Sequence, residues 1–75
     1  MNDYRNEGGG SGVARFELGV DSITIEYSSG ATYLYNVESA GREAIDTMKQ
    51  LAEAGKGLNS FIGKHVRGKY ARKMK

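Results

Sequence analysis

The chain has no cysteine, no proline, no tryptophan and only one histidine among its 75 residues. Without cysteine it can form neither disulfides nor thiolate metal sites, and one histidine leaves no second imidazole for a common zinc site. No apolar run approaches the roughly 20 residues of a membrane-spanning helix, and the N-terminus lacks the apolar part of a secretory signal peptide. We therefore expect a small soluble domain with no metal, no cofactor and no membrane partner.

The sequence also lacks a recognisable arrangement of catalytic residues. Nucleophilic catalysis needs a hydroxyl with a positioned base, but Ser60 and His65 do not share a helical face. No acidic residue follows Glu53 to orient the imidazole of His65. A chain of this length also offers little room for a deep pocket. We predict that the protein is not an enzyme and that His65 lies near a helix end, where the helix dipole favours a cation.

The chain divides into three parts by composition. Residues 1–12 are polar and Gly/Ser-rich, which is typical of a flexible leader, and they lack the Gly-Lys-Ser/Thr ending of a phosphate-binding loop. Residues 13–70 carry the periodic apolar pattern of a single domain. Residues 71–75 are predicted to be a basic, frayed C-terminal tail.

Apolar and polar residues alternate between Val13 and Val37, which predicts three strands. Their shared apolar face holds Ala14, Phe16, Leu18, Ile23, Ile25, Tyr27, Tyr33, Tyr35 and Val37. The Ser28–Gly30 turn suits a three-residue hairpin loop that ends in a left-handed glycine. This loop pairs Ile25 with Tyr33 and Ile23 with Tyr35, whereas a one-residue slip would separate the apolar sets. A loop around Val20-Asp21 likewise pairs Leu18 with Ile23 and Phe16 with Ile25.

After the third predicted strand, apolar residues recur at the spacing of a helix. Ser39 is the predicted N-cap of a helix whose apolar residues are Ile45, Met48, Leu51 and Ala52, and Gly55 fits the position just past its end. A second, shorter helix is predicted from about Leu58 to His65, with an apolar stripe of Leu58, Phe61, Ile62 and Val66. The predicted fold is therefore α+β: a three-stranded antiparallel β-meander followed by two helices packed on one face, in the order β-β-β-α-α.

Charge is distributed very unevenly along the chain. Residues 1–55 hold all nine acids and four bases, a net charge of −5, whereas residues 56–75 hold seven bases and no acid. Such a segment is typical of a polyanion-binding surface, although it can also merely solubilise the chain. The candidate nucleic-acid-binding residues are Lys64, Arg67, Lys69, Tyr70, Arg72 and Lys73. Arginine forks and lysine ammonium groups suit phosphate oxygens, and Tyr70 either stacks on a base or pins the tail to the core.

The Tyr33-x-Tyr35 pair, with Tyr27 nearby, has two interpretations. Aromatic rings on one face of a sheet can stack on unpaired bases. The register instead places both rings toward the helices, and their shared parity with Ile23 and Ile25 favours core packing. The opposite face, with Thr24, Glu26, Thr32 and Asn36, has neither aromatics nor positive charge.

Residues 23–30, followed by Tyr33–Val37, resemble the KTSC domain, whose mark is a Y-x-Y motif between a serine–glycine turn and a closing valine. Gly57, Asn59, Ile62 and the Arg67–Tyr70 run are similar to the glycine, Asn-x-x-Ile element and basic stretch near that domain's end. The family occurs at the C-terminus of some lysyl-tRNA synthetases and as a free-standing bacterial protein. The resemblance implies a bacterial, cytoplasmic α+β domain, and the attachment to a synthetase implies RNA as its ligand.

We therefore expect a non-enzymatic accessory domain, monomeric or weakly dimeric, that binds RNA or another polyanion through its basic C-terminal segment. RNA is preferred over DNA in this interpretation. The alternative is a protein-interaction module that holds an acidic protein at a sheet edge or in the groove between helix and tail. A third is a helper protein of phage or mobile-element origin that binds only its own copies.

Overall fold

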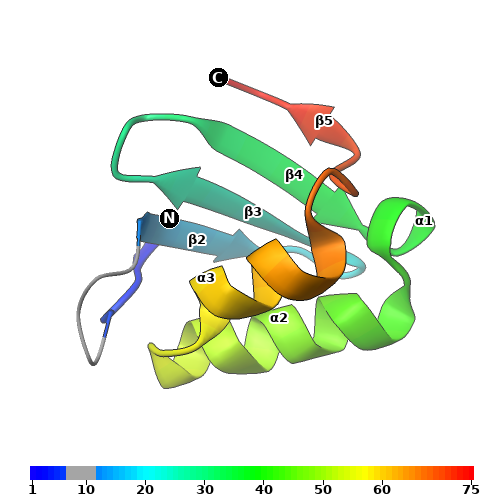
Figure 1. Ribbon diagram of the computed structural model, residues 1–75, viewed down its shortest axis with the longest axis horizontal. Helices are drawn as coiled ribbons and strands as arrows, with labels where there is room; N and C mark the ends of the chain where they lie inside the picture. Colours follow the sequence, from blue (N-terminus) through cyan, green and yellow to red (C-terminus); the bar gives the residue numbers. More distant parts are fainter. Residues whose placement is uncertain (7–11) are drawn as a thin grey trace.

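The computed structural model describes residues 1–6 and 12–75, which form an antiparallel sheet with helices on one face (Figure 1). The predicted α+β class is confirmed. The sheet has five strands in sequential order: β1 (Asn2–Asp3), β2 (Val13–Leu18), β3 (Ser22–Tyr27), β4 (Thr32–Asn36) and β5 (Arg72–Lys73).

The central meander has the predicted register. Across β3 and β4, Ile23 lies opposite Tyr35 and Ile25 opposite Tyr33. Across β2 and β3, Phe16 lies opposite Ile25 and Leu18 opposite Ile23. The Tyr27 amide donates to the carbonyl of Ala31 at 2.8 Å, and Gly30 has a φ of 97°, so the turn needs glycine at this position.

The prediction of three strands is wrong, because a short strand is added at each edge. β1 comes from residues assigned to the flexible leader (1–12), and β5 comes from the predicted frayed tail (71–75). Two-residue strands are too short to show a period-two pattern, and backbone hydrogen bonds hold them irrespective of side-chain type. Residues 7–11 of the predicted leader lie outside the described residues.

The helical part has more pieces than the predicted two helices. They are α1 (Val37–Ala40), α2 (Arg42–Ala54), α3 (Leu58–Phe61) and the π-helical turn η1 (Ile62–Val66), which continues α3.

The prediction of Ser39 as an N-cap is wrong. Asn36 caps α1, and Ser39 occupies the third helical position, where it completes a reciprocal capping box. Both residue types can cap, and Asn36 does so because its extended backbone directly precedes the helical turn. The predicted helix end is confirmed, since Gly55 has a φ of 78° and its amide donates to the carbonyl of Leu51 at 2.9 Å.

The core lies between one sheet face and the helices, as predicted, but Leu18 of the predicted apolar face is exposed, and a register shift between Val13 and Arg15 buries Val13 in place of Ala14. Phe16, Ile23, Ile25 and Tyr35 from the sheet pack against residues of the helical layer, and all are buried. The helical contribution consists of Ile45, Met48, Ala52, Leu58, Ile62 and Val66. Tyr4, from the segment after β1, joins this core, and its hydroxyl accepts a hydrogen bond of 3.2 Å from the Leu58 amide.

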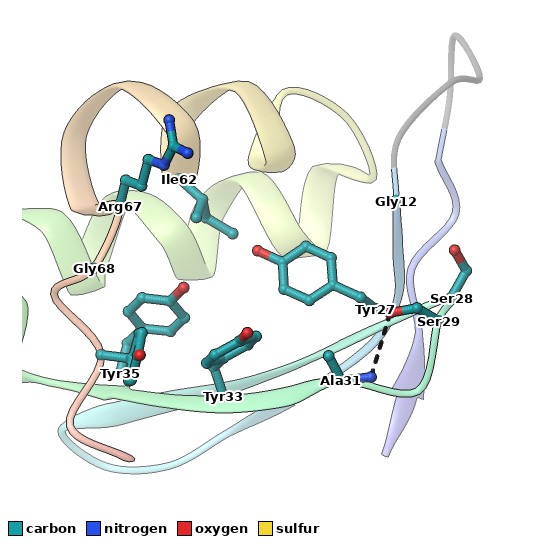
Figure 2. A pocket seen from close by; sticks show the side chains of 11 residues that line it. Gly12, Tyr27, Ser28, Ser29, Ala31, Tyr33, Tyr35, Ile62, Arg67 and Gly68 are labelled. Atoms are coloured by element: carbon teal, nitrogen blue, oxygen red, sulfur yellow. Dashed lines mark hydrogen bonds between the residues drawn. The ribbon is translucent and has the colours of Figure 1, made fainter. Parts of the chain in front are cut away.

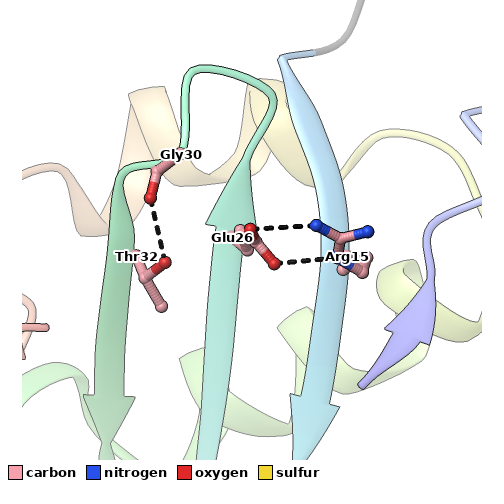
Figure 3. A network of polar contacts seen from close by, with 4 residues as sticks. All are labelled: Arg15, Glu26, Gly30 and Thr32. Carbon is pink, nitrogen blue, oxygen red and sulfur yellow. Dashed lines mark hydrogen bonds and ion pairs between the residues drawn. The ribbon is translucent and has the colours of Figure 1, made fainter. Parts of the chain in front are cut away.

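The other face of the sheet is polar. Figure 3 shows Arg15 on β2 forming a two-pronged ion pair with Glu26 on β3, with distances of 2.8 and 3.0 Å. Thr32 is buried, but its hydroxyl donates to the Gly30 carbonyl at 3.2 Å. Among the described residues, no helix combines the length and apolar character needed to cross a membrane.

Candidate functional site

A pocket of about 650 Å³ lies between the β3–β4 hairpin and the chain that leaves η1 (Figure 2). Figure 2 shows three tyrosine rings on the sheet side, with Ile62 and Arg67 on the helical side. The pocket is lined by Gly12, Tyr27, Ser28, Ser29, Ala31, Tyr33, Tyr35, Ile62, Arg67, Gly68 and Tyr70. We call it the tyrosine pocket.

The register of the hairpin places three of these tyrosines. Tyr27, Tyr33 and Tyr35 occupy alternate positions on paired strands, so all three rings project from the helix-bearing face. Tyr35 is almost completely buried, with 3% of its surface exposed, whereas Tyr27 and Tyr33 are half-buried. Tyr27 and Tyr33 pack edge to face with ring centroids 5.9 Å apart. Tyr35 thus forms the floor of the tyrosine pocket, and the other two rings form its sides.

The fourth tyrosine comes from the basic segment. The centroid of the Tyr70 ring lies 4.8 Å from that of Tyr33 and 6.3 Å from that of Tyr35. Tyr70 remains 39% exposed. Of the two roles considered for this residue, the pinning of the C-terminal segment against the sheet is therefore present in the structure. The exposed remainder of the ring is still able to contact a ligand.

Burial alters the titration of two of the pocket hydroxyls. It raises the pKa of Tyr35 well above the ordinary tyrosine value, and it also raises the pKa of Tyr27. The neighbouring Tyr27 hydroxyl adds to the increase in pKa at Tyr35, whereas the Tyr35 hydroxyl opposes the increase in pKa at Tyr27. An ordinary tyrosine ionises only near pH 10, so near neutral pH both hydroxyls are uncharged hydrogen-bond donors and acceptors, and burial extends this state to higher pH.

The fixed charge around the tyrosine pocket is positive. Arg67 lines it, and the Nζ atom of Lys73 lies 5.8 Å from the centroid of the Tyr33 ring. None of the described residues that line the pocket is acidic. The site therefore combines aromatic surfaces and neutral hydroxyls with cations at its edge, which suits a planar group attached to an anion.

The six candidate nucleic-acid-binding residues from the sequence analysis do not all lie at the tyrosine pocket. Arg67 and Tyr70 line the tyrosine pocket, and Lys73 lies beside it. Arg72 is paired with Leu34, so alternation along β5 places it on the opposite face of the sheet from Lys73. Lys64 and Lys69 are exposed and do not line the pocket.

Sequence reasoning did not anticipate the pocket. For Tyr33 and Tyr35 the sequence favoured core packing over stacking on bases, and for Tyr70 it left open base stacking or pinning of the tail to the core. The only available signal was the hairpin register, which aligned Tyr27, Tyr33 and Tyr35 but did not show that Tyr70 would return to them. Ser28 and Ser29 were taken only as turn residues, yet both line the pocket.

Among residues 1–6 and 12–75, no three acidic or histidine side chains gather closely enough to hold a metal ion. Comparison of the chain with protein-family models, curated proteins and solved structures finds no match. The resemblance to the KTSC domain therefore stays a prediction from the residues.

Proposed function

We propose that this protein binds single-stranded nucleic acid, with RNA preferred over DNA, through the tyrosine pocket and the basic segment beside it. One observation carries the proposal: the same C-terminal segment supplies a pocket tyrosine (Tyr70), a pocket arginine (Arg67) and the lysine next to Tyr33 (Lys73). Aromatic platforms beside cations are the usual means of binding unpaired bases together with their phosphates.

The distribution of charge along the chain supports this proposal. The seven basic residues of positions 56–75 have no acid among them to repel phosphate. Exposed Lys64 and Lys69 flank Arg67 in the chain and extend the positive surface beyond the tyrosine pocket. A duplex would present only phosphates to this surface, because its bases are stacked and cannot enter a pocket. Single strands therefore gain contacts that a duplex lacks.

The test is fluorescence anisotropy of labelled single-stranded RNA, single-stranded DNA of the same sequence, and duplex DNA, at low and near-physiological salt. We expect single-stranded RNA to remain bound at the higher salt, whereas duplex binding is lost. Equal loss of all three at higher salt would overturn the proposal, because it would show only unspecific charge attraction. Binding to an acidic protein without binding to RNA would also overturn it, in favour of an interaction module.

A matched pair of variants locates the surface. Lys73→Glu changes the charge on the pocket side of β5, and Arg72→Glu makes the same reversal on the other face. We expect Lys73→Glu to weaken RNA binding and to reduce the salt slope by about one unit, and Arg72→Glu to have the smaller effect. Equal effects of the two reversals would contradict a binding surface confined to the pocket side.

A further inference from the structure

We infer that the tyrosine pocket takes one unpaired nucleobase out of a single strand and that Arg67 holds the adjacent phosphate. This inference rests on the proposed function and adds to it the site at which a single base of the strand is bound. The volume of about 650 Å³ lies within the range of roughly 300–1,000 Å³ that is common for small-ligand pockets. The tyrosine pocket therefore has room for a base and its sugar.

The walls of the pocket are suited to the two faces of a base. Tyr27, Tyr33 and Tyr70 are only partly buried, so each keeps some ring surface for stacking. Tyr35 closes the floor, which prevents a strand from passing straight through the pocket. A strand that crosses this surface can therefore place a base in the pocket only by turning it away from its neighbours.

The pocket also has partners for the edges of a base. Hydroxyl groups come from the tyrosines and from Ser29 in the hairpin turn, whose oxygen accepts from the Ala31 amide at 3.5 Å and whose proton is left to donate. Hydroxyls both donate and accept, so they can satisfy the mixed donor and acceptor pattern that every base edge presents. The guanidinium of Arg67 is a fork that matches two oxygens of one phosphate.

The charge of the site decides between a base and a cationic ligand. Clusters of tyrosines also bind quaternary ammonium groups and methylated lysines through the faces of their rings. Here Arg67 lines the pocket, Lys73 lies over Tyr33, and no carboxylate belongs to the described lining. Two fixed positive charges repel a cation and attract a phosphate, so the tyrosine pocket favours a nucleotide.

Tyrosine fluorescence can report occupancy directly. The chain has five tyrosines and no tryptophan, and four of the tyrosines line the pocket. The fifth, Tyr4, is buried in the core. A base stacked in the pocket would quench this emission, whereas phosphate contacts alone would leave it largely unchanged.

The experiment compares oligouridylate of about ten nucleotides with an abasic ribose-phosphate chain of equal length and charge, by anisotropy and by tyrosine emission. We expect oligouridylate to quench the emission and to bind about tenfold more tightly than the abasic chain. Tyr70→Leu should weaken the binding of oligouridylate about tenfold and should change the binding of the abasic chain only slightly. Tyr4→Phe is the control and should preserve the quenching by oligouridylate.

The outcomes separate the inference from the function on which it rests. Equal binding of both chains without quenching overturns the base pocket but leaves nucleic-acid binding in place. Absence of oligouridylate binding, with circular dichroism showing an intact fold, overturns both. Quenching by choline rather than by oligouridylate also overturns the inference, because it would show a cage for cations. Since Tyr70 is the most exposed of the four rings, Tyr70→Leu is the pocket variant least at risk of misfolding.

Discussion

The ring of Tyr70 lies against the ring of Tyr33, with centroids 4.8 Å apart and an interplanar angle of 51°. These residues are far apart in the chain, and their contact joins the C-terminal segment to the central hairpin. The backbone continues the connection, because the Ala71 amide donates to the Leu34 carbonyl and the Met74 amide to the Thr32 carbonyl, both at 2.7 Å. The aromatic contact and the short strand β5 thus hold the same segment in place.

Tyr70→Ala should release this segment. Loss of the aromatic pair is expected to cost about 1 kcal/mol of unfolding free energy. We also expect faster hydrogen exchange at the amides of Ala71 and Met74, because β5 loses its side-chain anchor. Tyr70→Phe keeps the ring and is the control. Slow exchange at both amides in Tyr70→Ala would show that the backbone pairing holds β5 without the ring.

Tyr4 should contribute strongly to stability, although it lies in a segment that reads as a leader. Its ring is buried in the core and its hydroxyl accepts from the Leu58 amide. Tyr4→Ala should lower the unfolding free energy by about 3 kcal/mol, as for other buried aromatics. Tyr4→Phe should cost about 1 kcal/mol, because it leaves only the Leu58 amide without its partner. Urea denaturation measures both, and an unchanged midpoint in Tyr4→Ala would refute a structural role for the N-terminal segment.

Two glycines in the helical region should respond in opposite ways to alanine. Gly55 has a φ of 78°, and a Cβ atom there would lie 2.8 Å from the Cβ of Arg5. The Arg5 guanidinium donates to the carbonyls of Glu53 and Ala54 at 2.8 and 2.7 Å, so Arg5 is not free to move without loss of these bonds.

Gly55→Ala is therefore expected to cost about 1–2 kcal/mol. Gly63→Ala is the matched control, because Gly63 lies within η1, has no atom within 4 Å of its Cβ position, and should gain up to about 1 kcal/mol. Thermal unfolding distinguishes the two, and destabilisation by both substitutions would contradict this account.

The sequence predicted the central fold well because its signals are local. Alternation around Ile23, Ile25 and Tyr35 and the Ser28–Gly30 turn both require one register, and the structure has it. Gly55 ended the first long helix as predicted, because a left-handed position strongly favours glycine. The hairpin register and the helix end both depend on residues that are close together in the chain, so each can be recognised from a short stretch of sequence.

The edges and the tyrosine pocket could not be predicted, because they depend on distant contacts. β1 and β5 are held by backbone hydrogen bonds to β2 and β4, which leave no trace in residue type. The position of Tyr70 beside Tyr33 depends on the turn after η1, where Gly68 has a φ of 78°. The basic pattern drew attention to Arg67, Tyr70 and Lys73, which lie in or beside the tyrosine pocket. Composition alone cannot show that alternation places Arg72 on the other face.

Alkaline pH should destabilise the fold through the buried tyrosines. Burial raises the pKa of Tyr35 and of Tyr27 above their ordinary value near 10, so the folded protein retains protons that the unfolded chain releases. Below about pH 10 both states hold these protons, and stability should not depend on them. Above about pH 10 the unfolded state binds fewer protons, so the unfolding free energy should fall as the pH rises toward the folded-state pKa.

Urea midpoints measured at about pH 8, 10 and 11 test this dependence. Tyr35→Phe removes the hydroxyl with the larger increase in pKa, so its midpoint should fall less steeply above about pH 10 than that of the unchanged chain. Identical alkaline slopes in Tyr35→Phe and the unchanged chain would show that Tyr35 ionises as readily in the folded protein as in the unfolded one, and its place as the closed floor of the tyrosine pocket would then be wrong.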